Sequence, residues 1–546
     1  IVNKTIKEDA SLLYLGKAPL KGIKIYLADR YFKGVGEVLA GTIVEDGKMN
    51  TLRVIKRDSS KIKDIFNLKD EYVQSIQEGW QKTKDTAYYD ILLNELGFSS
   101  FQKKRIKDDF GLSILQTLII NPLSLLGSVP FLSFADIENI CERLRLNITD
   151  EQKALAATEF ELKRVETRDG HTCAPFDRII PNVVKLTELD PEFIVEKVKN
   201  NESGFTFSKR NNKEIIQTKK SLKRDKKIIQ EIDRITNSFA RGKNKKNFLK
   251  SELKTQKDVD LSDEQMLAVN AAINNPISII TGGPGAGKTT MVRALVSAIV
   301  NLNLKLKLTA PTGKAATRIS TEGLKQYKPS TIHSYLGVFG ETTDKEYDIM
   351  IVDESSMIDI DLMQDLLVSI PDKASIVFIG DADQLPPVGP GQVFKDLIES
   401  DKISVVKLTG NYRQHLMSGI AKAAREIVKG KTPVLENDYS KEMIFDEISR
   451  GNQAEKILQC YFDTLPKLGI SMDEIQILSP QRDGETGVYN LNRLIQQRLT
   501  SSSNPVFTKQ IKIKNNDFEM NFFVGDKVIM RKNKVKELGL VNGDIG

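Results

Sequence analysis

A glycine-rich segment from Gly282 to Thr289 limits the folds open to this chain more than any other feature. Its sequence, Gly-Gly-Pro-Gly-Ala-Gly-Lys-Thr, follows an apolar run from Ser278 to Ile280 and precedes a helix-like stretch. The spacing G-x-x-x-x-G-K-[ST] is that of a loop between a strand and a helix, in which glycines let the backbone wrap closely around a phosphate chain. It therefore predicts a nucleotide-binding α/β fold.

Further apolar runs support a parallel sheet with helices on both faces. They occur at Leu306 to Leu308, Ile349 to Val352 and Ile376 to Ile379, and Gly or polar residues follow each one. Such repetition is typical of strands that alternate with helices. Up to about residue 200 the pattern instead indicates short helices broken by glycine and proline. We place the boundary between the two halves in the basic segment that separates them.

The loop and one strand end carry groups that ATP hydrolysis needs. Lys288 would offset charge on the β- and γ-phosphates, and Thr289 would reach a magnesium ion. Asp353 and Glu354 end a buried strand, so we expect Asp353 to hold Mg²⁺ through its water shell and Glu354 to polarise the attacking water. An exposed acidic strand end is the simpler alternative, but the phosphate loop upstream favours catalysis.

Two residues after later strands complete the predicted catalytic set. Gln384 could sense the γ-phosphate, because an amide both donates and accepts hydrogen bonds. Arg413 would act as an arginine finger if it lies across a cleft from Lys288, and would then tie hydrolysis to domain closure. The expected phosphate cradle consists of Gly282, Gly283, Pro284, Gly285, Ala286, Gly287, Lys288, Thr289 and Thr290.

Charge and cysteine content restrict the partners and the compartment. The 546 residues predict roughly three to four domains, and the net charge of +7 favours polyanions. A dense basic run from Lys209 to Lys257 is either a solvated helix and linker or a direct phosphate contact. Three cysteines without a CxxC pair argue against a disulfide framework or a zinc ribbon, so we expect a cytoplasmic protein.

No run of ~18 apolar residues indicates a membrane span, and the start at Ile1 lacks the apolar stretch of a signal peptide. Because Ile1 is not a methionine, we expect that the natural N-terminus was trimmed or left out.

Near the N-terminus, Phe32 to Ala40 has the Gly-x-Gly spacing of a tight turn between two short helices. Backbone N–H groups at Gly34 and Gly36 could hold a phosphate oxygen without reading bases. An ordinary corner between helices is the alternative. Val129 to Asp136 could form a second such unit, but it lacks both glycines.

The order of these motifs resembles the RecD-like superfamily 1 DNA helicases, in particular the longer type that works without RecB and RecC, over nearly the whole chain. Leu261 to Gln265 looks like the adenine-reading segment, with Gln265 as the reader. Leu308 to Ala316 and Ser330 to Ser334 look like motifs that contact a single strand. The resemblance therefore implies DNA contacts by Pro311, Thr312, Lys314 and His333.

Each of these segments has a simpler explanation when taken alone. The turn at Pro311 to Gly313 could be only a strand-to-helix connection. Thr331 could simply cap a helix, and His333 could be a satisfied, half-buried histidine.

Four short segments of the N-terminal half are similar to the family's helix-hairpin-helix and following region: Asn94 to Gly97, Asn121 to Pro122, Phe134 to Asp136 and Asp169 to Thr172. There are departures as well. Val129 to Phe134 lacks the expected glycines, Phe66 to Lys69 does not restore a clean hairpin, and Leu336 to Asp348 is short for the family's strand-separating pin.

Beyond Ile477 the chain looks like a second motor domain. Ile477 to Arg482, with Gly487 and Asn490, resembles its opening, and Phe523 to Met530 and Val541 to Gly546 resemble a small SH3-like β-barrel inserted in it. The motor expected from this resemblance is incomplete at Gly546, with its last motifs and a second catalytic arginine missing.

The predicted architecture is α/β, with tandem RecA-like P-loop domains preceded by a mainly helical helix-hairpin-helix region and followed by the SH3-like insertion. The expected domains are a helical region with helix-hairpin-helix-like units (1–150), a helical or winged-helix-like region with a basic linker (151–257), a first RecA-like ATPase domain (258–402), and an incomplete second RecA-like domain (403–546) with the insertion from about residue 505.

The resemblance implies an ATP-dependent DNA helicase or translocase of DNA repair or recombination, moving 5′ to 3′. ATP and Mg²⁺ are the expected cofactors, and single-stranded DNA and tailed duplex DNA the expected partners of a monomer. The residues identify no protein partner and no pathway. Two alternatives stay open, a P-loop ATPase that remodels nucleic acid without separating strands and a DNA-binding scaffold with an inactive motor.

Overall fold

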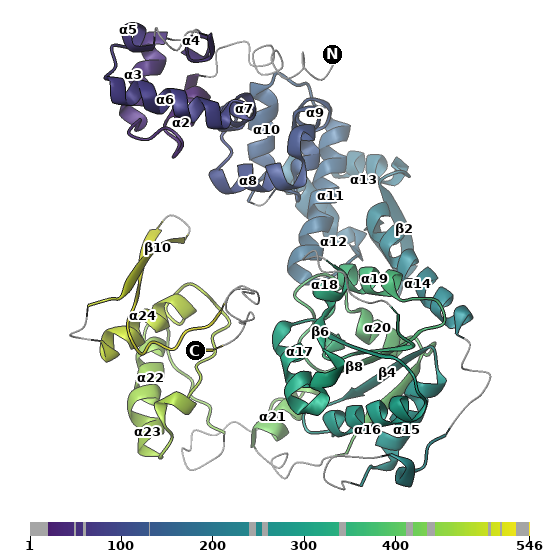
Figure 1. Cartoon of the computed structure of the whole chain (residues 1–546). Helices are drawn as coiled ribbons and strands as arrows, with labels where there is room; N and C mark the ends of the chain where they lie inside the picture. The colour runs from purple at the N-terminus through teal and green to yellow at the C-terminus, as the bar shows by residue number, and fades with distance from the viewer. Residues whose placement is uncertain are drawn as a thin grey trace. The chain divides into compact units, whose positions relative to one another are not determined.

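The computed structural model describes residues 20–47, 51–57, 62–129, 131–239, 247–253, 260–337, 346–410, 419–433, 443–500, 504–513, 516–530 and 545–546. The chain divides into two compact units (Figure 1). The first unit comprises residues 1–230, 359–364 and 387–392, and the second comprises 231–358, 365–386 and 393–546.

The first unit begins with a helical bundle around buried side chains that include Ile43, Ile62 and Ile76. Further helices then pack around a second core that includes Leu93, Ile106 and Ile137. The elements of the two bundles are α2 (Leu20–Leu27), α3 (Glu37–Gly47), α4 (Thr51–Arg57), α5 (Ile62–Phe66), α6 (Asp70–Thr83), α7 (Ala87–Glu95), α8 (Ser100–Asp109), η3 (Gly111–Ser113), α9 (Ile114–Ile120), η4 (Pro122–Leu125), α10 (Phe134–Arg143) and α11 (Asp150–Asp169).

Four turns between these helices share one conformation: a residue with positive φ, followed by a buried apolar residue. The pairs are Gly34 with Val35, Asn67 with Leu68, Gly97 with Phe98, and Phe131 with Leu132. Asn adopts a left-handed conformation with modest strain, whereas a bulky residue there is an outlier. The segments without the expected glycines therefore still form tight hairpins, and φ reaches 58° at Phe131.

After α11 the chain forms a small antiparallel sheet of order β1-β3-β2 beside two helices. The elements are β1 (Ala174–Pro175), α12 (Phe176–Thr187), α13 (Pro191–Asn200), β2 (Phe205–Arg210) and β3 (Lys213–Thr218). Phe207 pairs with Ile216 in the β2–β3 hairpin, and Ile216 is fully buried. With α11, the order helix, strand, two helices and hairpin is that of a winged helix.

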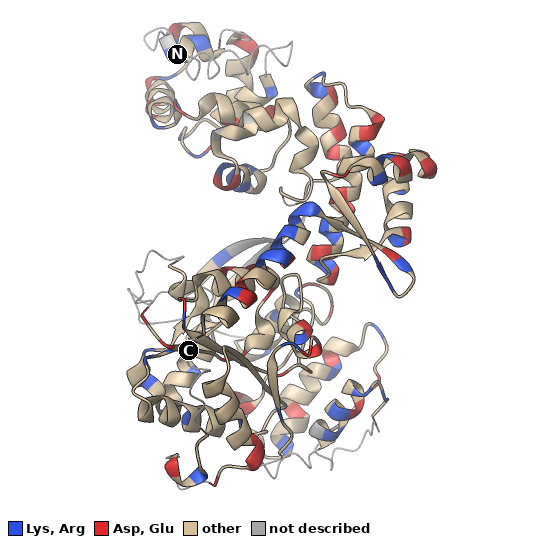
Figure 2. Ribbon diagram, turned by 90° about the vertical axis from the view of Figure 1, so that its right-hand side faces the viewer, with Lys and Arg blue, Asp and Glu red and all other residues tan. Residues whose placement is uncertain are grey.

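The basic run contributes mainly to α14 (Lys219–Ser238), where Figure 2 shows a concentration of Lys and Arg after the β2–β3 hairpin. Arg224 of this helix connects it to two other helices. In the first unit, Arg224 binds Glu166 and reaches Asp361 of α19 at 2.9 Å. Residues 240–246 of the basic run lie outside the described residues.

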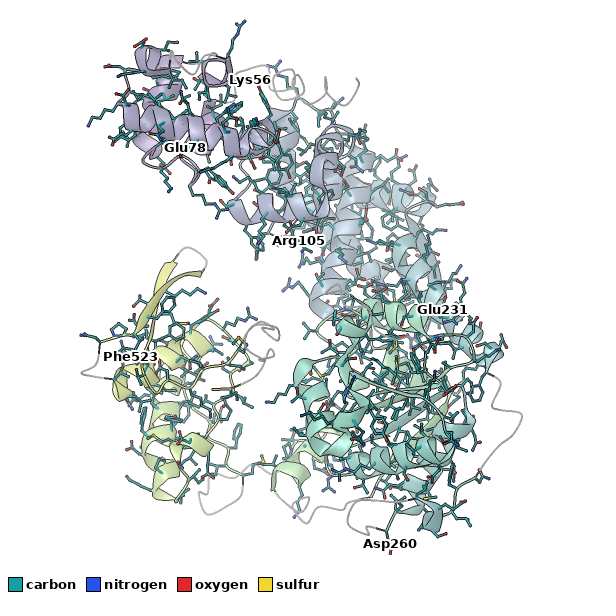
Figure 3. The ribbon with its side chains drawn as sticks, in the orientation of Figure 1. Lys56, Glu78, Arg105, Glu231, Asp260 and Phe523 are labelled. Carbon is teal, nitrogen blue, oxygen red and sulfur yellow. The ribbon has the colours of Figure 1, made fainter. Side chains whose placement is uncertain are left out.

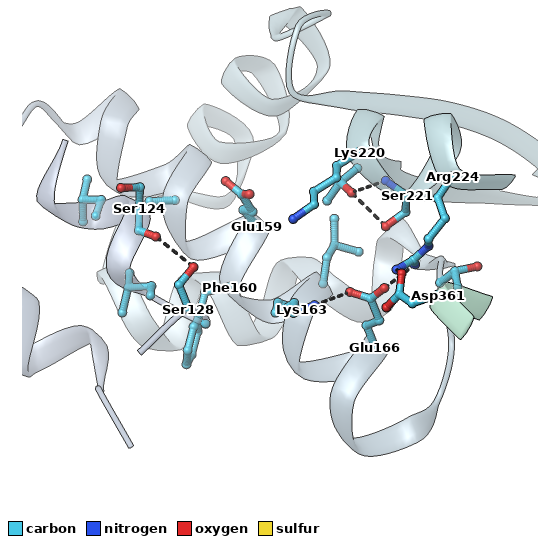
Figure 4. A pocket seen from close by; sticks show the side chains of 17 residues that line it. Ser124, Ser128, Glu159, Phe160, Lys163, Glu166, Lys220, Ser221, Arg224 and Asp361 are labelled. Carbon is cyan, nitrogen blue, oxygen red and sulfur yellow. Dashed lines mark hydrogen bonds and ion pairs between the residues drawn. The ribbon is translucent and has the colours of Figure 1, made fainter. Parts of the chain in front are cut away.

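Arg224 also lines a cavity of about 170 Å³ in the first unit (Figure 4). Its walls come from η4, α11, α14 and Asp361. Three basic side chains there, Lys163, Lys220 and Arg224, face three acids, Glu159, Glu166 and Asp361. The charges balance, so the cavity has no net attraction for an anion.

The second unit contains a six-stranded parallel sheet of order β6-β5-β7-β8-β4-β9. Every residue of β7 and β8 is buried, as expected for central strands covered on both faces. The strands are β4 (Ile277–Gly282), β5 (Leu306–Ala310), β6 (Ser330–Thr331), β7 (Ile349–Val352), β8 (Ser375–Gly380) and β9 (Ser404–Leu408).

Helices connect these strands and cover the sheet (Figure 1). They are η6 (Lys250–Glu252), α15 (Asp263–Asn274), α16 (Lys288–Asn301), α17 (Gly313–Ile319), η7 (Ser320–Leu324), η8 (Lys325–Tyr327), α18 (Ile332–Tyr335), η9 (Ser355–Met357), α19 (Ile360–Ser369) and α20 (Val393–Glu399). The predicted parallel α/β domain is therefore present. Of the segment from Leu336 to Asp348 that is expected to be a short pin, residues 338–345 lie outside the described residues.

From Gly419 onward the described residues form α21 (Gly419–Val428), α22 (Gln453–Gln459), η11 (Cys460–Thr464), α23 (Leu465–Lys467), η12 (Met472–Glu474), α24 (Val488–Leu499), β10 (Phe507–Ile513) and β11 (Asn516–Phe522). The two strands pair as an antiparallel hairpin, which ends just before Phe523 (Figure 3).

The described part of this region does not contain the parallel sheet expected for a second RecA-like domain. Leu478, at the expected opening of that sheet, is 87% exposed and belongs to no strand. A strand needs a neighbour to satisfy its backbone N–H and C=O groups, and no described strand pairs with this segment.

None of the described helices combines the length and the apolar character that crossing a bilayer requires.

Candidate nucleotide-binding site

The glycine-rich loop connects the carboxyl end of β4 to the start of α16. Gly285 and Gly287 have φ of 81° and 82°, which side chains rarely adopt. A Cβ on Gly282 would lie 2.8 Å from the carbonyl oxygen of Leu408, so that position also excludes a side chain. Around Gly283 a Cβ would meet no atom within 4 Å, which leaves the loop open on that side. This conformation fits a phosphate-binding loop.

Lys288 is held over the loop by its own backbone. Its Nζ donates hydrogen bonds to the carbonyl oxygens of Gly282 and, at 3.3 Å, of Gly283. Burial lowers the pKa of Lys288 below its ordinary value, although the nearby carboxylates of Asp381, Glu354 and Asp353 oppose the change. The ammonium group therefore lies where the carboxylates at the strand ends act on its charge.

Asp353 and Glu354 follow β7, whose neighbour β8 pairs in turn with β4. Their side chains are 13% and 19% exposed. Carboxyl ends of neighbouring parallel strands meet at one edge of a sheet, where α/β proteins bind ligands. The structure therefore brings the two acids and the loop to the same edge.

Arg318 of α17 is a member of this cluster that the sequence did not single out. Its guanidinium group donates to Oδ2 of Asp353 at 2.7 Å and pairs with Oε1 of Glu354 at 3.0 Å. The two predicted catalytic acids thus share one arginine. Arg318 lies just past the segment that resembles a strand-contacting motif, and its distance in sequence from the acids gave no signal of contact.

Asp381, directly after β8, is a second missed residue. Only 4% of it is exposed, and its Oδ1 accepts a hydrogen bond from the backbone of Asp383 at 3.1 Å. Of the nearby acids, Asp381 raises the pKa of Lys288 most strongly against the effect of burial. Gln384, the predicted phosphate sensor, is exposed in the following turn, and its side chain makes no hydrogen bond to the described residues. A side chain in that setting is available to a ligand.

Gln265 is 3% exposed, and both of its polar atoms have partners in the protein. Oε1 accepts from the backbone of Ser262 at 2.9 Å, which forms the capping box of α15, and Nε2 donates to the carbonyl of Gly287 at 3.0 Å. The residue expected to read adenine therefore connects its segment directly to the phosphate loop.

Glu264, next to it, positions the segment that leads to Arg413. Its carboxylate accepts hydrogen bonds from the hydroxyl of Thr409 and from the backbone of Thr409 at 2.7 Å and of Gly410 at 3.1 Å. The hydroxyl contact, followed by the backbone ones, lowers the pKa of Glu264. Arg413 itself lies outside the described residues.

The segments expected to contact a single strand follow β5 and β6, which pair at Ala310 and Thr331. Thr312 caps α17 by accepting from the backbone of Ala315 at 3.2 Å, and Thr331 caps α18 by accepting from Ser334 at 3.1 Å. Capping thus accounts for Thr331.

The alternative that His333 is a half-buried histidine is wrong, because its side chain is exposed. The side chain of Lys314 is exposed as well. The structure brings Pro311, Thr312, Lys314 and His333 to neighbouring strand ends. Gly34 and Gly36 belong instead to the first hairpin of the first unit.

Among the described residues, no group of three or more His, Cys, Asp and Glu side chains could hold a metal ion by itself. This fits magnesium, which typically binds one or two carboxylates, water and the phosphates of the substrate. Thr289, after the loop that follows β4, and Asp353, at the end of β7, provide such an incomplete set.

Two family models match the chain. One, described as an AAA domain, matches residues 260–446. The other, described as the HHH domain of the ATP-dependent RecD2 DNA helicase, matches residues 83–173. The first match contains the six-stranded sheet, and the second contains the hairpins at Gly97 and Phe131.

The chain covers only part of the length of three similar curated proteins. The ATP-dependent RecD2 DNA helicase of Deinococcus radiodurans is 26% identical over 544 residues, which cover 96% of this chain and 72% of that protein. The RecBCD enzyme subunit RecD of Buchnera aphidicola is 28% identical, with 52% of this chain and 58% of that subunit covered. The corresponding subunit of Haemophilus influenzae is 29% identical, with 52% and 57% covered.

Among solved structures, the Pif1 helicase from Candida albicans aligns with 53% of this chain and 68% of its own at 19% identity, with a TM-score of 0.32. A score this low carries no argument about the fold.

Proposed function

We propose that this chain, which belongs to the RecD-like superfamily 1 helicases, is an ATP-dependent DNA helicase that moves along single-stranded DNA. The observation that carries the proposal is the convergence of Lys288, Asp353, Glu354 and Asp381 at one edge of a parallel sheet, beside a glycine loop with the conformation of a phosphate cradle. The RecD2 helicase of Deinococcus radiodurans aligns with 96% of this chain and the RecD subunit of Buchnera aphidicola with 52% of it, which supports the proposal.

In this mechanism, Lys288 leaves the loop carbonyls to bind the β- and γ-phosphates, and the loop amides surround the phosphate chain. Glu354 orients the attacking water, and Gln384 contacts the γ-phosphate. Magnesium, held by Thr289 and Asp353, would neutralise charge on the phosphates. Gln265 contacts the adenine, while Arg413 closes on the nucleotide from the second motor domain.

Contact with single-stranded DNA comes from the carboxyl ends of β5 and β6. Pro311, Thr312, Lys314 and His333 would lie along the sugar-phosphate backbone, so affinity should fall steeply with salt and depend little on sequence. Gly34 and Gly36 would add a backbone contact to phosphate.

Several finer features rest on the family resemblance. They are 5′ to 3′ travel, a cytoplasmic monomer, action on tailed duplex DNA, and an SH3-like insertion that includes the β10–β11 hairpin. The parallel sheet of a second RecA-like domain belongs to the same set of proposals.

Hydrolysis and unwinding by the chain and by a Lys288→Ala variant test the proposal. We expect single-stranded DNA to stimulate hydrolysis, a 5′-tailed duplex to be unwound in preference to a 3′-tailed one, and the variant to lose activity by on the order of 10³-fold. Lys402→Ala, which changes an exposed lysine of the same unit, is the matched control. Hydrolysis without unwinding would favour a remodelling ATPase, and DNA binding without hydrolysis would favour a scaffold.

A further inference from the structure

Counted along the chain, the helical hairpins at Gly34, Asn67, Gly97 and Phe131 are the first to the fourth. Two exposed phenylalanine rings lie beside the third and the fourth of them. Phe101 is 58% exposed in the first turn of α8, and Phe131 is 90% exposed at the left-handed position of its hairpin. Their ring centroids are 6.1 Å apart, at an interplanar angle of 52°. Because burial would remove apolar area from water, two such rings exposed together indicate a surface that binds something.

The backbone at Phe131 adds to this indication. A bulky residue with φ of 58° is strained, and the equivalent positions of two other hairpins are Gly34 and Gly97, which avoid that strain. Strained backbone of this kind is concentrated at functional sites, where the side chain has a use that offsets its cost. A ring at this position therefore serves a purpose other than making the turn.

Charge distinguishes the third hairpin from the rest. The helices that follow the other three hairpins carry an acid in the first turn: Glu37 in α3, Asp70 and Glu71 in α6, and Asp136 in α10. The first turn of α8 has none, and its capping box uses the uncharged Gln102. A carboxylate at a helix start repels phosphate, so only the third hairpin, within the described residues, is free of that repulsion.

Basic side chains follow Phe101 within α8, namely Lys103, Lys104, Arg105 and Lys107 (Arg105 is labelled in Figure 3). Lys103 donates to Asn94 at 2.5 Å, and Arg105 pairs with Asp109 at 2.9 Å. Lys104 and Lys107 are exposed and have no ion-pair partner among the described residues. Aromatic rings next to unpaired cations are the combination that holds single-stranded nucleic acid.

We propose that Phe101 and Phe131 form a stacking platform for unpaired bases, with Lys104 and Lys107 holding the adjoining phosphates. Stacking requires the face of a base, which a duplex hides, so the occupant is a single strand rather than duplex DNA. The platform adds a second strand contact, in the helical region, to the one proposed at the motor.

Binding of a labelled single-stranded oligonucleotide, measured by fluorescence anisotropy without nucleotide, tests the platform. The variant is Phe101→Leu with Phe131→Gly, which removes both rings, keeps apolar area at one site and relieves backbone strain at the other, so it should fold. We expect the affinity to fall by on the order of tenfold. Ile120→Ala, which truncates another exposed apolar side chain of this unit (76% exposed), should bind as the unaltered chain does.

A strand with abasic sites isolates the stacking. The unaltered chain and the double variant should differ by on the order of tenfold on the normal strand, and bind the abasic strand almost equally. Two results would overturn the platform: equal affinities of the unaltered chain and the double variant for the normal strand, or the same loss of affinity on the normal and the abasic strand. The first result would indicate that the rings bind a protein partner instead.

A second readout tests the phosphate contacts. Lys104→Ala should reduce the slope of log affinity against log salt by about 1. An unchanged slope would remove Lys104 from the site.

The platform rests on the proposed function only in its choice of ligand. Because binding is measured without nucleotide, a chain that did not hydrolyse ATP would still show the ring-dependent difference. Loss of that difference in a chain with DNA-stimulated hydrolysis would remove the platform alone.

Discussion

The nucleotide site and the hairpin region use sequence in different ways. At the edge of the sheet, chemistry fixes the residue type, because a phosphate needs the ammonium group of Lys288 and a water needs the carboxylate of Glu354. In the hairpins the turn fixes only a conformation. Gly34, Asn67, Gly97 and Phe131 all provide it, with φ of 81°, 47°, 92° and 58°.

This difference shows why motif matching succeeds in one region and undercounts in the other. The sequence left the second and fourth hairpins in doubt, because Val129 to Asp136 lacks both glycines and Phe66 to Lys69 does not restore a clean hairpin. The structure keeps them, because each turn is followed by a buried apolar side chain, Leu68 and Leu132 at 7% exposure, that holds the helices in place. Substitutions in both regions can test this contrast.

The largest effect is expected from a change that preserves shape at the nucleotide site. Glu354→Gln keeps the size of the side chain but removes the base that orients water. DNA-stimulated hydrolysis should fall by about 10²- to 10⁴-fold, while ATP and DNA still bind. Steady-state hydrolysis and nucleotide-binding assays measure the two properties separately.

Glu399→Gln, which changes an exposed acid at the end of α20, is the control and should hydrolyse normally. Failure of Glu354→Gln to bind nucleotide would mean that Glu354 shapes the site rather than positions water.

The next effect is structural and lies in the first unit. Glu166 is buried, and burial would raise the pKa of its carboxyl group, but hydrogen bonds from Arg224 and Lys163 outweigh this and hold the pKa below its ordinary value. Glu166→Gln breaks a mostly buried pair, so it should destabilise the first unit by about 3 kcal/mol. Hydrogen exchange of the α11 and α14 amides would measure the loss.

The sign of the pH dependence follows from the direction of that shift. A lowered pKa in the folded state means that Glu166 stabilises fully above the ordinary carboxyl pKa, and that this contribution is lost as pH falls through the folded-state pKa. The difference between the unaltered chain and Glu166→Gln should therefore shrink in acid. Glu159→Gln, which changes an exposed acid of the same helix and cavity, is the control and should leave the stability of the first unit at neutral pH almost unchanged.

A smaller effect tests the hairpins themselves. Gly97→Ala places a side chain at φ of 92° and should destabilise the first unit by about 1 kcal/mol, whereas Asn67→Gly and Phe131→Gly should be neutral or stabilising because glycine accepts positive φ without strain. Thermal unfolding of the three variants gives the order. Destabilisation by Phe131→Gly would show that the ring itself supports the fold.

The sequence predicted much of the nucleotide sheet because four of its six strands, β4, β5, β7 and β8, contain short apolar runs, and functional residues follow them. Loop, strand end and turn appear in linear order, so Lys288, Asp353 and Gln384 could be placed without a structure. The roles of Arg413 and of the contacts to DNA stay predictions. The sequence could not predict which residues of other helices contact the site. The periodicity of a helix shows which of its faces is apolar, but not which strand end or loop its charged side chains reach.

Arg318 and Glu264 illustrate this limit. Arg318 reaches two acids on a neighbouring strand end, and Glu264 reaches the backbone at Thr409, 145 residues away. Both are ordinary charged residues of helices in the sequence, where a solvated surface is the usual expectation. The expected second parallel sheet stays a prediction: Ile477 to Pro480 has the composition of a strand, but among the described residues no strand pairs with it.

The smallest effect is expected at Arg318. It tests whether the residue type at this position is fixed by chemistry, as at the nucleotide site, or is exchangeable, as in the hairpin turns. If its residue type is fixed by chemistry, Arg318→Ala should reduce turnover strongly. We expect instead that Arg318 only neutralises Asp353 and Glu354 and competes with magnesium for them. Its side chain is 46% exposed, and exposed ion pairs are worth roughly 0.2–1 kcal/mol. The magnesium concentration for half-maximal hydrolysis should therefore fall by about 2- to 5-fold, with maximal turnover little changed. A magnesium titration separates the two cases, because a fall in maximal turnover with an unchanged magnesium requirement would assign Arg318 to the chemistry itself.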